Sequence, residues 1–329
     1  MNALVIGYGS IGKRHIKNLL SISDCNIIIC TTQPKPELIK NNRCSFVKTI
    51  QEGLLHNPTI GFVTNVSNRH IQTSMLLAKA GCHIFIEKPL SNSLKDTEKL
   101  LNVVQKEKLV TLMGCNLRFH DCIKKIKSLL EQKTIGKIIS VKSECGTYLP
   151  DWHPYENYSK SYAARDDLGG GVVLTCIHEL DYLYWFFGEI KEVFSMTGKF
   201  SDLKIKSSDL SAILLKFKNN IIGEVHLDYF QRPEFRSCKI IGTKGTIYWD
   251  STNNEVKIFD IKKKKWVTKL KIKNYNKNKQ YIDELSHFLN CIDKKEKSIN
   301  NLNQGIETLN IALNTIKSSK EKKLIKMIS

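Results

Sequence analysis

The chain has 329 residues, enough for two domains of ordinary size. Hydrophobic residues make up 41% and charged residues 25%, a composition that excludes an intrinsically disordered chain. The formal net charge of +19 comes mostly from lysines spread along the chain, without a recognised nucleic-acid motif, so we expect no nucleic-acid partner.

No apolar run approaches the roughly 20 residues that span a bilayer, so no membrane partner is expected. The N-terminus also lacks the pattern of a secretory signal. The ten cysteines include no CxxC pair, which favours reduced thiols over a disulfide framework and predicts no metal site. These features together predict a cytoplasmic protein.

The first residues predict a strand, a glycine turn and a helix. An apolar run at 3–6 leads into GYGSIG, after which apolar residues recur at helical spacing. In this context GxGxxG predicts that a dinucleotide binds with its pyrophosphate at the helix N-terminus, because glycines permit the turn and the close approach. The candidate cofactor residues here are Gly7, Tyr8, Gly9, Ser10, Ile11 and Gly12.

The second predicted strand, 26–30, runs into the segment TTQPK. It lacks the acidic residue that holds the ribose 2'-hydroxyl of NAD. The hydroxyls of Thr31 and Thr32 and the charge of Lys35, with Lys13 and Arg14 after the glycine turn, suit a 2'-phosphate better. The predicted cofactor is NAD or NADP, with NADP slightly favoured.

Three more strands are predicted at 59–64, 82–86 and 110–114, with helices at 71–80 and 93–106 between them. This alternation predicts an α/β fold in which residues 1–120 form a doubly wound parallel sheet. Ligands of such sheets bind at the carboxyl ends of the strands. The polar residues at these ends complete the cofactor candidates: Thr64, Asn65, Asn68, His70, Glu87, Lys88 and Asn116.

The pattern changes after residue 120. A helix at 123–130 and a strand at 136–145 are followed, beyond an aromatic loop, by alternating runs at 190–199, 209–218, 221–230, 235–241, 246–249, 256–259 and 266–272. These runs predict hairpin-linked strands, and the lysine run at 260–266 suits a hairpin at a sheet edge. Residues 121–329 are therefore expected to form an α+β domain with a large, mostly antiparallel sheet. Its last helices, at 281–293 and 302–316, could pack back on the first domain.

The stretch 168–189, LGGGVVLTCIHELDYLYWFFGE, combines three glycines with an amphipathic run. If the run is one helix, Thr175, His178, Asp181 and Tyr182 lie on one face. A histidine there can exchange a proton near neutral pH. The alternative is a glycine loop capping a core helix, with His178 hydrogen-bonded in the interior in a structural role only.

These motifs together resemble the Gfo/Idh/MocA family of NAD(P)-dependent oxidoreductases. The resemblance spans essentially the whole chain. It rests on the glycine turn, NxxNRH at 65–70, Glu87-Lys88-Pro89, the NLRF segment at 116–119, GGG followed by HxxD, and IIGTKGTIYWD at 240–250. The 143–158 loop and the 177–189 segment are similar to members found with sugar and sialic-like acid pathways.

The resemblance implies hydride transfer between C4 of the nicotinamide and a carbinol carbon of a sugar, cyclitol or nucleotide sugar, with Lys88 and His178 catalytic. Oxidising a secondary alcohol requires a base and a cation that stabilises the developing alkoxide, so we expect His178 as general acid/base and Lys88 as the electrostatic group. The family commonly has an aspartate one turn before the histidine, where this chain has Leu174 and Thr175. Thr175 and Asp181 therefore join the catalytic candidates.

Substrate contacts are expected in the 146–168 loop, near the glycines, because aromatic faces and charged donors suit a polyhydroxylated ligand. The candidates are Arg118, Tyr148, Asp151, Trp152, Tyr162 and Arg165. Arg232 and Arg236 are expected to be exposed on the outer sheet.

The large sheet of the family often forms an oligomer interface, which implies a homodimer or homotetramer. Two alternative functions stay open: a non-enzymatic NAD(P)-binding sensor or assembly protein, and an NAD-dependent glycosidase.

Overall fold

The computed structural model describes residues 1–33, 41–152 and 157–327. The chain divides into two compact units. Unit 1 comprises Met1–Asn116 and Lys277–Leu309, and unit 2 comprises Leu117–Asn276 and Asn310–Ser329. Unit 1 thus includes a segment near the C-terminus that folds with the N-terminal residues.

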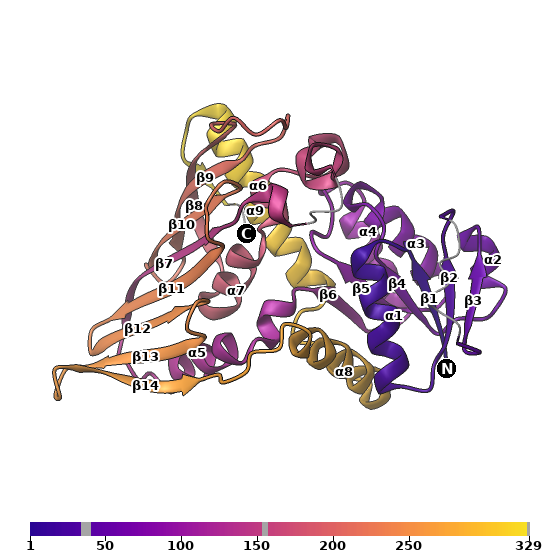
Figure 1. The fold of residues 1–329 in the computed structure, drawn as a ribbon, viewed down its shortest axis with the longest axis horizontal. Helices are drawn as coiled ribbons and strands as arrows, with labels where there is room; N and C mark the ends of the chain where they lie inside the picture. Colours follow the sequence, from indigo (N-terminus) through magenta and orange to yellow (C-terminus); the bar gives the residue numbers. More distant parts are fainter. Residues whose placement is uncertain (34–40, 153–156, 328–329) are drawn as a thin grey trace. The chain divides into compact units, whose positions relative to one another are not determined.

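Unit 1 is built on a parallel six-stranded sheet with the order β3-β2-β1-β4-β5-β6 (Figure 1). The order reverses between β1 and β4, where doubly wound sheets bind dinucleotides. The predicted parallel sheet is therefore confirmed. Its strands are β1 (Asn2–Ile6), β2 (Asn26–Cys30), β3 (Cys44–Val47), β4 (Ile60–Val63), β5 (His83–Glu87) and β6 (Thr111–Gly114).

The helices of unit 1 are α1 (Ser10–Ile22), α2 (Ile50–Leu54), α3 (His70–Lys79), α4 (Thr97–Lys106) and α8 (Lys279–Lys294), with a 3-10 turn η1 (Ser67–Arg69). Helix α8 packs on α1: the side chains of Asn18 and Asn278 are hydrogen-bonded at 2.8 Å, and the Arg14 guanidinium lies 4.4 Å from the Tyr281 ring centroid. The predicted helix at 281–293 therefore belongs to the first compact unit.

Unit 2 contains a nine-stranded sheet with the order β14-β13-β12-β11-β7-β10-β9-β8-β15. Only the β7–β10 pair is parallel among the strand pairs described for this sheet, which confirms the predicted mostly antiparallel sheet. The strands are β7 (Ile138–Gly146), β8 (Ile190–Gly198), β9 (Leu210–Phe217), β10 (Ile222–Asp228), β11 (Phe235–Gly242), β12 (Gly245–Asp250), β13 (Glu255–Asp260), β14 (Lys265–Lys271) and β15 (Ile325–Lys326).

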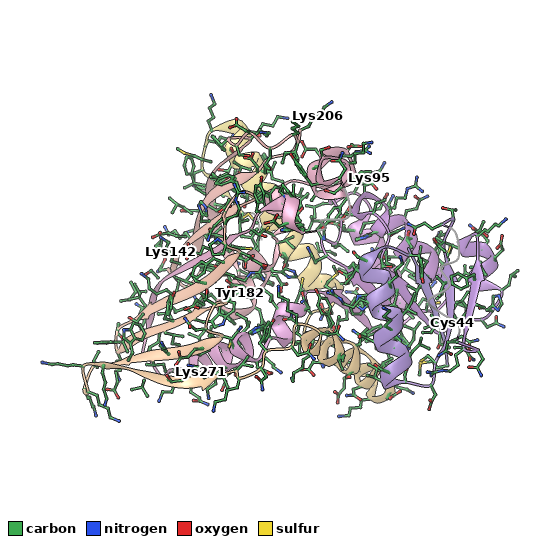
Figure 2. All side chains as sticks on the ribbon, viewed as in Figure 1. Cys44, Lys95, Lys142, Tyr182, Lys206 and Lys271 are labelled. Atoms are coloured by element: carbon green, nitrogen blue, oxygen red, sulfur yellow. The ribbon has the colours of Figure 1, made fainter. Side chains whose placement is uncertain are left out.

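Helices cover one face of this sheet. They are α5 (Asp121–Glu131), α6 (Val172–Thr175), α7 (His178–Phe187) and the C-terminal part of α9 (Leu302–Glu321). Figure 2 shows Tyr182 between α7 and the sheet, where its hydroxyl hydrogen-bonds that of Ser143 on β7, and Lys142 extending from the opposite face. The connections contain 3-10 turns: η2 (Asn116–Phe119), η3 (Leu149–Asp151), η4 (Tyr158–Lys160), η5 (Tyr162–Ala164) and η6 (Asp166–Leu168).

The prediction of one helix through Thr175 and His178 is wrong. Helix α6 ends at Thr175 and α7 begins at His178, because Cys176 leaves the helical region with φ −93° and ψ 35°. Thr175 is therefore the last residue of one helix and His178 the first residue of the next, so they do not share one continuous helical face.

Two further predictions concern the edge strand of the large sheet and the state of the cysteines. The lysine run forms the β13–β14 hairpin, and β14 is an edge strand, as predicted. All ten cysteines are free thiols, nine of them buried. Within the described ranges, no helix combines the length and apolarity needed to cross a lipid bilayer.

Candidate active site

The glycine turn after β1 is held by close backbone packing. Gly7 has φ +107°, and a Cβ there would lie 2.6 Å from the carbonyl oxygen of Thr64. A Cβ on Gly12 would lie 2.2 Å from the carbonyl oxygen of Gly7. The Thr64 hydroxyl donates to the carbonyls of Ile6 and Gly7, at 3.0 and 2.9 Å. Gly7, Gly12 and Thr64 therefore shape the turn.

Gly9 differs from these glycines, because nothing lies within 4 Å of a Cβ built on it. It is the N-cap of α1 and provides no side-chain cap, and the first turn, with Ser10 and Ile11, contains no acidic residue. Open backbone N–H groups at the positive end of a helix dipole suit a pyrophosphate. The residues present thus fit a dinucleotide.

The neighbouring side chains are arranged around this turn. Tyr8 is buried and packs edge-on against Phe46. The Lys13 ammonium lies 5.0 Å from the Tyr8 ring centroid. After β2, the Thr31 hydroxyl accepts a hydrogen bond from the backbone of Gln33 at 3.1 Å, and Thr32 is exposed. Lys35 lies outside the described residues.

His70 connects the segments that follow β4 and β5. It is 1% exposed, with Nδ1 2.9 Å from the carbonyl oxygen of Pro89 and Nε2 3.0 Å from that of Asn65. Burial lowers the pKa of His70, against the effect of both carbonyls. The Asn65 amide donates to Thr73 at 2.9 Å, while Asn68 is exposed in η1. His70 therefore fixes the backbone at the strand ends.

The Glu87-Lys88-Pro89 segment leaves β5 with its glutamate engaged inside unit 1. One carboxylate oxygen of Glu87 lies 2.6 Å from Nε2 of His15, a fully buried residue of α1. The other accepts from the backbone N–H of Lys88 at 3.2 Å. Lys88 itself is partly exposed, and Asn116, at the end of unit 1, is buried. Glu87 thus orients the backbone of Lys88.

In unit 2 the GGG turn, residues 169–171, packs closely against the backbone of residues 162–165. A Cβ on Gly170 would lie 2.2 Å from the carbonyl oxygen of Tyr162, and the N–H groups of Gly170 and Gly171 donate to Arg165 and Ala163 at 2.9 Å. The glycines therefore accommodate the 162–165 backbone. This confirms the expected proximity to the glycines for residues 162–165 of the loop.

The residues at the α6–α7 junction are buried. His178 is 8% exposed and Thr175 2%. Burial, and next the thiol of Cys176, raise the pKa of Tyr229 well above its usual value, while a side-chain hydrogen bond with Thr175 acts in the opposite direction. At this position the chain has Leu174 and Thr175, where the family commonly has an aspartate.

Arg118 and Asp181 form a buried ion pair. The guanidinium Nε and Nη2 each donate to a different oxygen of Asp181 at 2.8 Å, with the side chains 0% and 1% exposed. The guanidinium also lies 5.6 Å from the ring centroid of Trp185. A planar guanidinium in this bidentate geometry fixes the first turn of α7.

A second charged cluster was missed from the sequence. Nε of Arg236 lies 3.0 Å from a carboxylate oxygen of Glu179, which is fully buried on α7. Nη2 of Arg236 lies 3.1 Å from Sγ of Cys145. The expected exposure of Arg236 is wrong, because β11 turns this side chain toward the helices. Arg232 is exposed, with its guanidinium 3.9 Å from the Tyr148 ring centroid.

The remaining loop candidates differ in exposure. Trp152 donates from Nε1 to the Thr147 hydroxyl at 2.7 Å and packs edge-on against Tyr229. Asp151 and Arg165 are exposed, Tyr162 is partly exposed, and Arg165 pairs with Asp167. Over the described part of the chain, no group of three or more His, Cys, Asp or Glu side chains is arranged to hold a metal ion.

Comparisons with known proteins agree with this architecture. The chain is similar to myo-inositol 2-dehydrogenase of Thermotoga maritima, 25% identical over 338 aligned positions that cover 98% of this chain and 97% of the relative. It is also similar to 2,7-anhydro-N-acetylneuraminate hydratase of Escherichia coli, 23% identical over 60% of this chain and 52% of the relative. The fold matches levoglucosan dehydrogenase in complex with NADH with a TM-score of 0.88, at 16% identity and covering 100% and 99% of the two chains.

Two family models match nearly the whole chain. The model described as an oxidoreductase family with an NAD-binding Rossmann fold matches residues 1–115, and its C-terminal alpha/beta domain matches residues 127–327. The chain belongs to the Gfo/Idh/MocA family of NAD-binding oxidoreductases.

Proposed function

We propose that the protein transfers a hydride between a nicotinamide dinucleotide and a carbinol carbon of a sugar or nucleotide-sugar derivative. The observation that carries the proposal is the glycine turn, in which Gly7 and Gly12 are required by packing and Gly9 is left open. The bound dinucleotide would supply the hydride acceptor or donor. The myo-inositol and levoglucosan dehydrogenases support a sugar-type substrate.

We assign the general acid/base role to His178, the first residue of α7. In alcohol oxidation it would take the hydroxyl proton, and in the reverse direction return it. Asp181 lies one turn further and is held by Arg118. We therefore infer that Asp181 and Arg118 position the first turn of α7, rather than transfer protons or bind substrate.

Lys88 is proposed as the cation that stabilises the developing alkoxide. Its backbone is held by Glu87, which is itself held by His15 of α1. Lys88 is partly exposed, whereas Glu87 is buried. Glu87 would thus act as a positioning residue for Lys88.

Thr175 is proposed to orient the site without supplying charge. Its neutral hydroxyl stabilises an imidazolium less than a carboxylate does.

NADP is proposed ahead of NAD, because the segment after β2 offers Thr31 and Thr32 and no carboxylate. Lys13 and Arg14, the basic residues that follow the glycine turn, lie over aromatic rings: Lys13 over that of Tyr8 and Arg14 over that of Tyr281. The preference therefore depends on the 31–35 segment.

We propose that the polyhydroxylated substrate contacts the loop residues Tyr148, Asp151, Trp152, Tyr162 and Arg165. Support comes from their partial exposure on the segment that packs against the GGG turn, near the start of α6. The likeness to the Escherichia coli hydratase makes sialic-like acids a class to include among the candidates. We place the protein in the cytoplasm because its cysteines are free.

A second copy of this chain is proposed as the partner of the outer face of the unit 2 sheet, the face opposite α5–α7. Large apolar side chains on this face are exposed by 38–65%: Met196, Leu214, Ile222 and Ile241. Between these apolar side chains, Lys142 of β7 pairs with Glu224 of β10 on one side and with Lys239 of β11 on the other. Apolar groups mixed with both charge signs suit a self-complementary contact related by a two-fold axis.

The test begins with titrations of the purified protein with NADH and NADPH, followed by a 340 nm absorbance screen with NAD and NADP. The panel contains inositols, free sugars, sialic-like acids and nucleotide sugars. His178→Ala should bind cofactor normally but lose roughly 10²–10⁴ of the rate, the usual contribution of general acid–base catalysis. His56→Ala, at an exposed histidine of unit 1, is the matched control and should keep full activity.

The same screen separates the alternatives. Consumption of a glycoside without net change in NADH would favour the glycosidase, in which oxidation is transient. Tight cofactor binding without turnover would favour a sensor or assembly protein, provided that His178→Ala leaves the function in cells unchanged. This alternative stays open because Leu174 and Thr175 stand in place of the family aspartate.

A further inference from the structure

Arg232 is the one arginine of unit 2 without a carboxylate partner among the residues that the structure describes. The other three arginines of this unit pair with Asp181, Asp167 and Glu179. Arg232 is exposed, and its guanidinium lies 3.9 Å from the ring centroid of Tyr148. An aromatic face attracts a cation in this position but does not neutralise its charge. Arg232 therefore presents a positive charge at a defined place on the surface.

The ring contact leaves the hydrogen-bond donors of this guanidinium available. A guanidinium carries five N–H donors in one plane, and stacking on a ring uses a face of that plane rather than its edge. Over the described ranges, no protein acceptor takes a hydrogen bond from the Arg232 side chain. Two donors of the planar fork match two oxygens of a carboxylate or a phosphate. The side chain is thus suited to bind an anion from solution.

The arginine and the tyrosine come from two segments that are fixed to each other. One carboxylate oxygen of Asp228 accepts from the backbone N–H groups of residues 230 and 231, at 3.0 and 2.7 Å, and this aspartate is 2% exposed. Two backbone hydrogen bonds, at 3.2 and 2.9 Å, join residues 147–149 to residues 228–229. The turn after β10 therefore holds the guanidinium near the ring before any ligand binds, which lowers the entropy cost of binding.

This pair lies at the end of the sheet where α7 begins. Glu179, in the first turn of α7, contacts an arginine that reaches Sγ of Cys145, near the end of β7. Tyr182, about one turn further along the helix, bonds Ser143, two positions earlier in the strand. Helix α7, with His178 as its first residue, therefore starts at the carboxyl end of β7. Strand β10 is the parallel neighbour of β7, so both strands lead into the stacked pair at that same end.

We propose that Arg232, stacked on Tyr148, binds an anionic group of the substrate. The substrate class is then an acidic sugar derivative, whose carboxylate or phosphate accepts two hydrogen bonds from the guanidinium. A neutral sugar offers only hydroxyl groups to the same donors, and its contact is weaker because it lacks the charge. The identification of the anion as part of the substrate rests on the proposed function, whereas binding of the anion at Arg232 does not.

The full-length protein without cofactor offers a test that needs no turnover. Phenylglyoxal modifies accessible arginines, and trypsin keeps Arg232 inside the peptide 219–236, because a proline follows it. The modified fraction is measured by mass spectrometry without sugar and with glucose, glucuronate, N-acetylneuraminate or glucose 1-phosphate. The acidic sugars should slow modification of Arg232 at least fivefold, and glucose should not. Arg69, an exposed arginine of unit 1, should be modified equally in every reaction.

The pattern of protection distinguishes the two anions. Protection by glucuronate or N-acetylneuraminate alone assigns a carboxylate, and protection by glucose 1-phosphate alone assigns a phosphate. Equal modification of Arg232 in all the reactions overturns the proposal. Equal protection of Arg232 and Arg69 overturns it as well, because it would show a general ionic effect.

Variants connect the anion site to the reaction. Arg232→Met should raise KM for an acidic sugar at least tenfold, with kcat little changed and the affinity for NADPH unaffected. Arg232→Lys keeps the charge without the planar fork and should recover part of that loss. Lys133→Met, which removes one charge from an exposed turn of unit 2, is the matched control and should leave KM unchanged. Circular dichroism checks that each variant is folded.

The two kinds of failure can be told apart. Protection of Arg232 without turnover of any sugar would count against the proposed function alone. Turnover of neutral and acidic sugars with equal kcat/KM, unchanged in Arg232→Met, would overturn the assignment of Arg232 while the oxidoreductase function stands.

Discussion

The guanidinium of Arg118 holds both carboxylate oxygens of Asp181 at 2.8 Å, although the two residues are 63 positions apart in the chain. Arg118 comes from η2 and Asp181 from the first turn of α7, so the pair joins the start of unit 2 to the helix that begins with His178. Neither side chain is more than 1% exposed. The pair therefore fixes the helix but leaves little surface for a ligand.

Replacing one residue of this ion pair should lower the free energy of unfolding much more than replacing both. Arg118→Met leaves the Asp181 carboxylate buried without its cation, and we expect a loss of about 3–5 kcal/mol in the free energy of unfolding. Arg118→Met/Asp181→Leu should recover a large part of that loss. All four tryptophans lie in unit 2, so urea unfolding followed by tryptophan fluorescence reports the relevant unit. A double variant as unstable as the single one would contradict this account.

Gly9 and Gly7 should respond differently to the same substitution. Gly9→Ala introduces a Cβ into open space, so the fold should remain, but affinity for NADPH should fall at least tenfold, about 1.4 kcal/mol, because the Cβ occupies the approach of the pyrophosphate. Gly7→Ala places a Cβ 2.6 Å from a backbone oxygen at positive φ and should destabilise unit 1 itself. Calorimetric titration and thermal unfolding separate the two effects. Unchanged NADPH affinity in a folded Gly9→Ala would count against the proposed site.

How much the sequence could predict depends on the range of the interaction. The strand, turn and helix of residues 2–22 were predictable because the apolar run, the GxGxxG motif and the helical spacing are all local signals. Strand β3 was missed, since it is four residues long and only partly buried. The break at Cys176 was missed because the segment TCIH contains neither glycine nor proline.

Long-range pairs escaped prediction for a different reason. Arg236 looks like a surface residue in the sequence, and only the register of β11 with β7 turns it toward Cys145 and Glu179. The pairing of Arg118 with Asp181, 63 positions further along the chain, likewise could not be read from the sequence. The partners of both arginines are fixed by tertiary structure.

The outer face should behave as a self-association surface. Leu214 is 51% exposed on β9, opposite Phe194 of β8 and Glu224 of β10. Leu214→Glu should convert the dimer or tetramer into a smaller species, because the new carboxylate would be desolvated in the contact. Leu55→Glu, at an 81% exposed leucine of unit 1, is the matched control and should leave the oligomeric state unchanged. Light scattering after size exclusion measures both, and a monomeric unsubstituted protein would refute the interface.

His120 should make unit 2 sensitive to acid. It caps α5 by accepting a hydrogen bond from the backbone of Cys122 at 3.1 Å, and it packs between the rings of Trp249 and Tyr275. Burial lowers its pKa from 6.5 to about 4, so the folded protein keeps this imidazole neutral. The unfolded chain binds the proton more readily, and stability attributable to His120 is complete above pH 6.5 and lost as the pH falls toward 4.

The size of this effect follows from the pKa difference, which corresponds to roughly 3 kcal/mol. His120→Asn keeps a capping oxygen without a titrating group. The variant loses ring contacts and should be less stable at pH 7, but its disadvantage should shrink by roughly 3 kcal/mol between pH 7 and pH 4. Urea unfolding at both pH values, followed by tryptophan fluorescence, measures the difference. Parallel pH profiles for the two proteins would show that His120 does not carry this acid sensitivity.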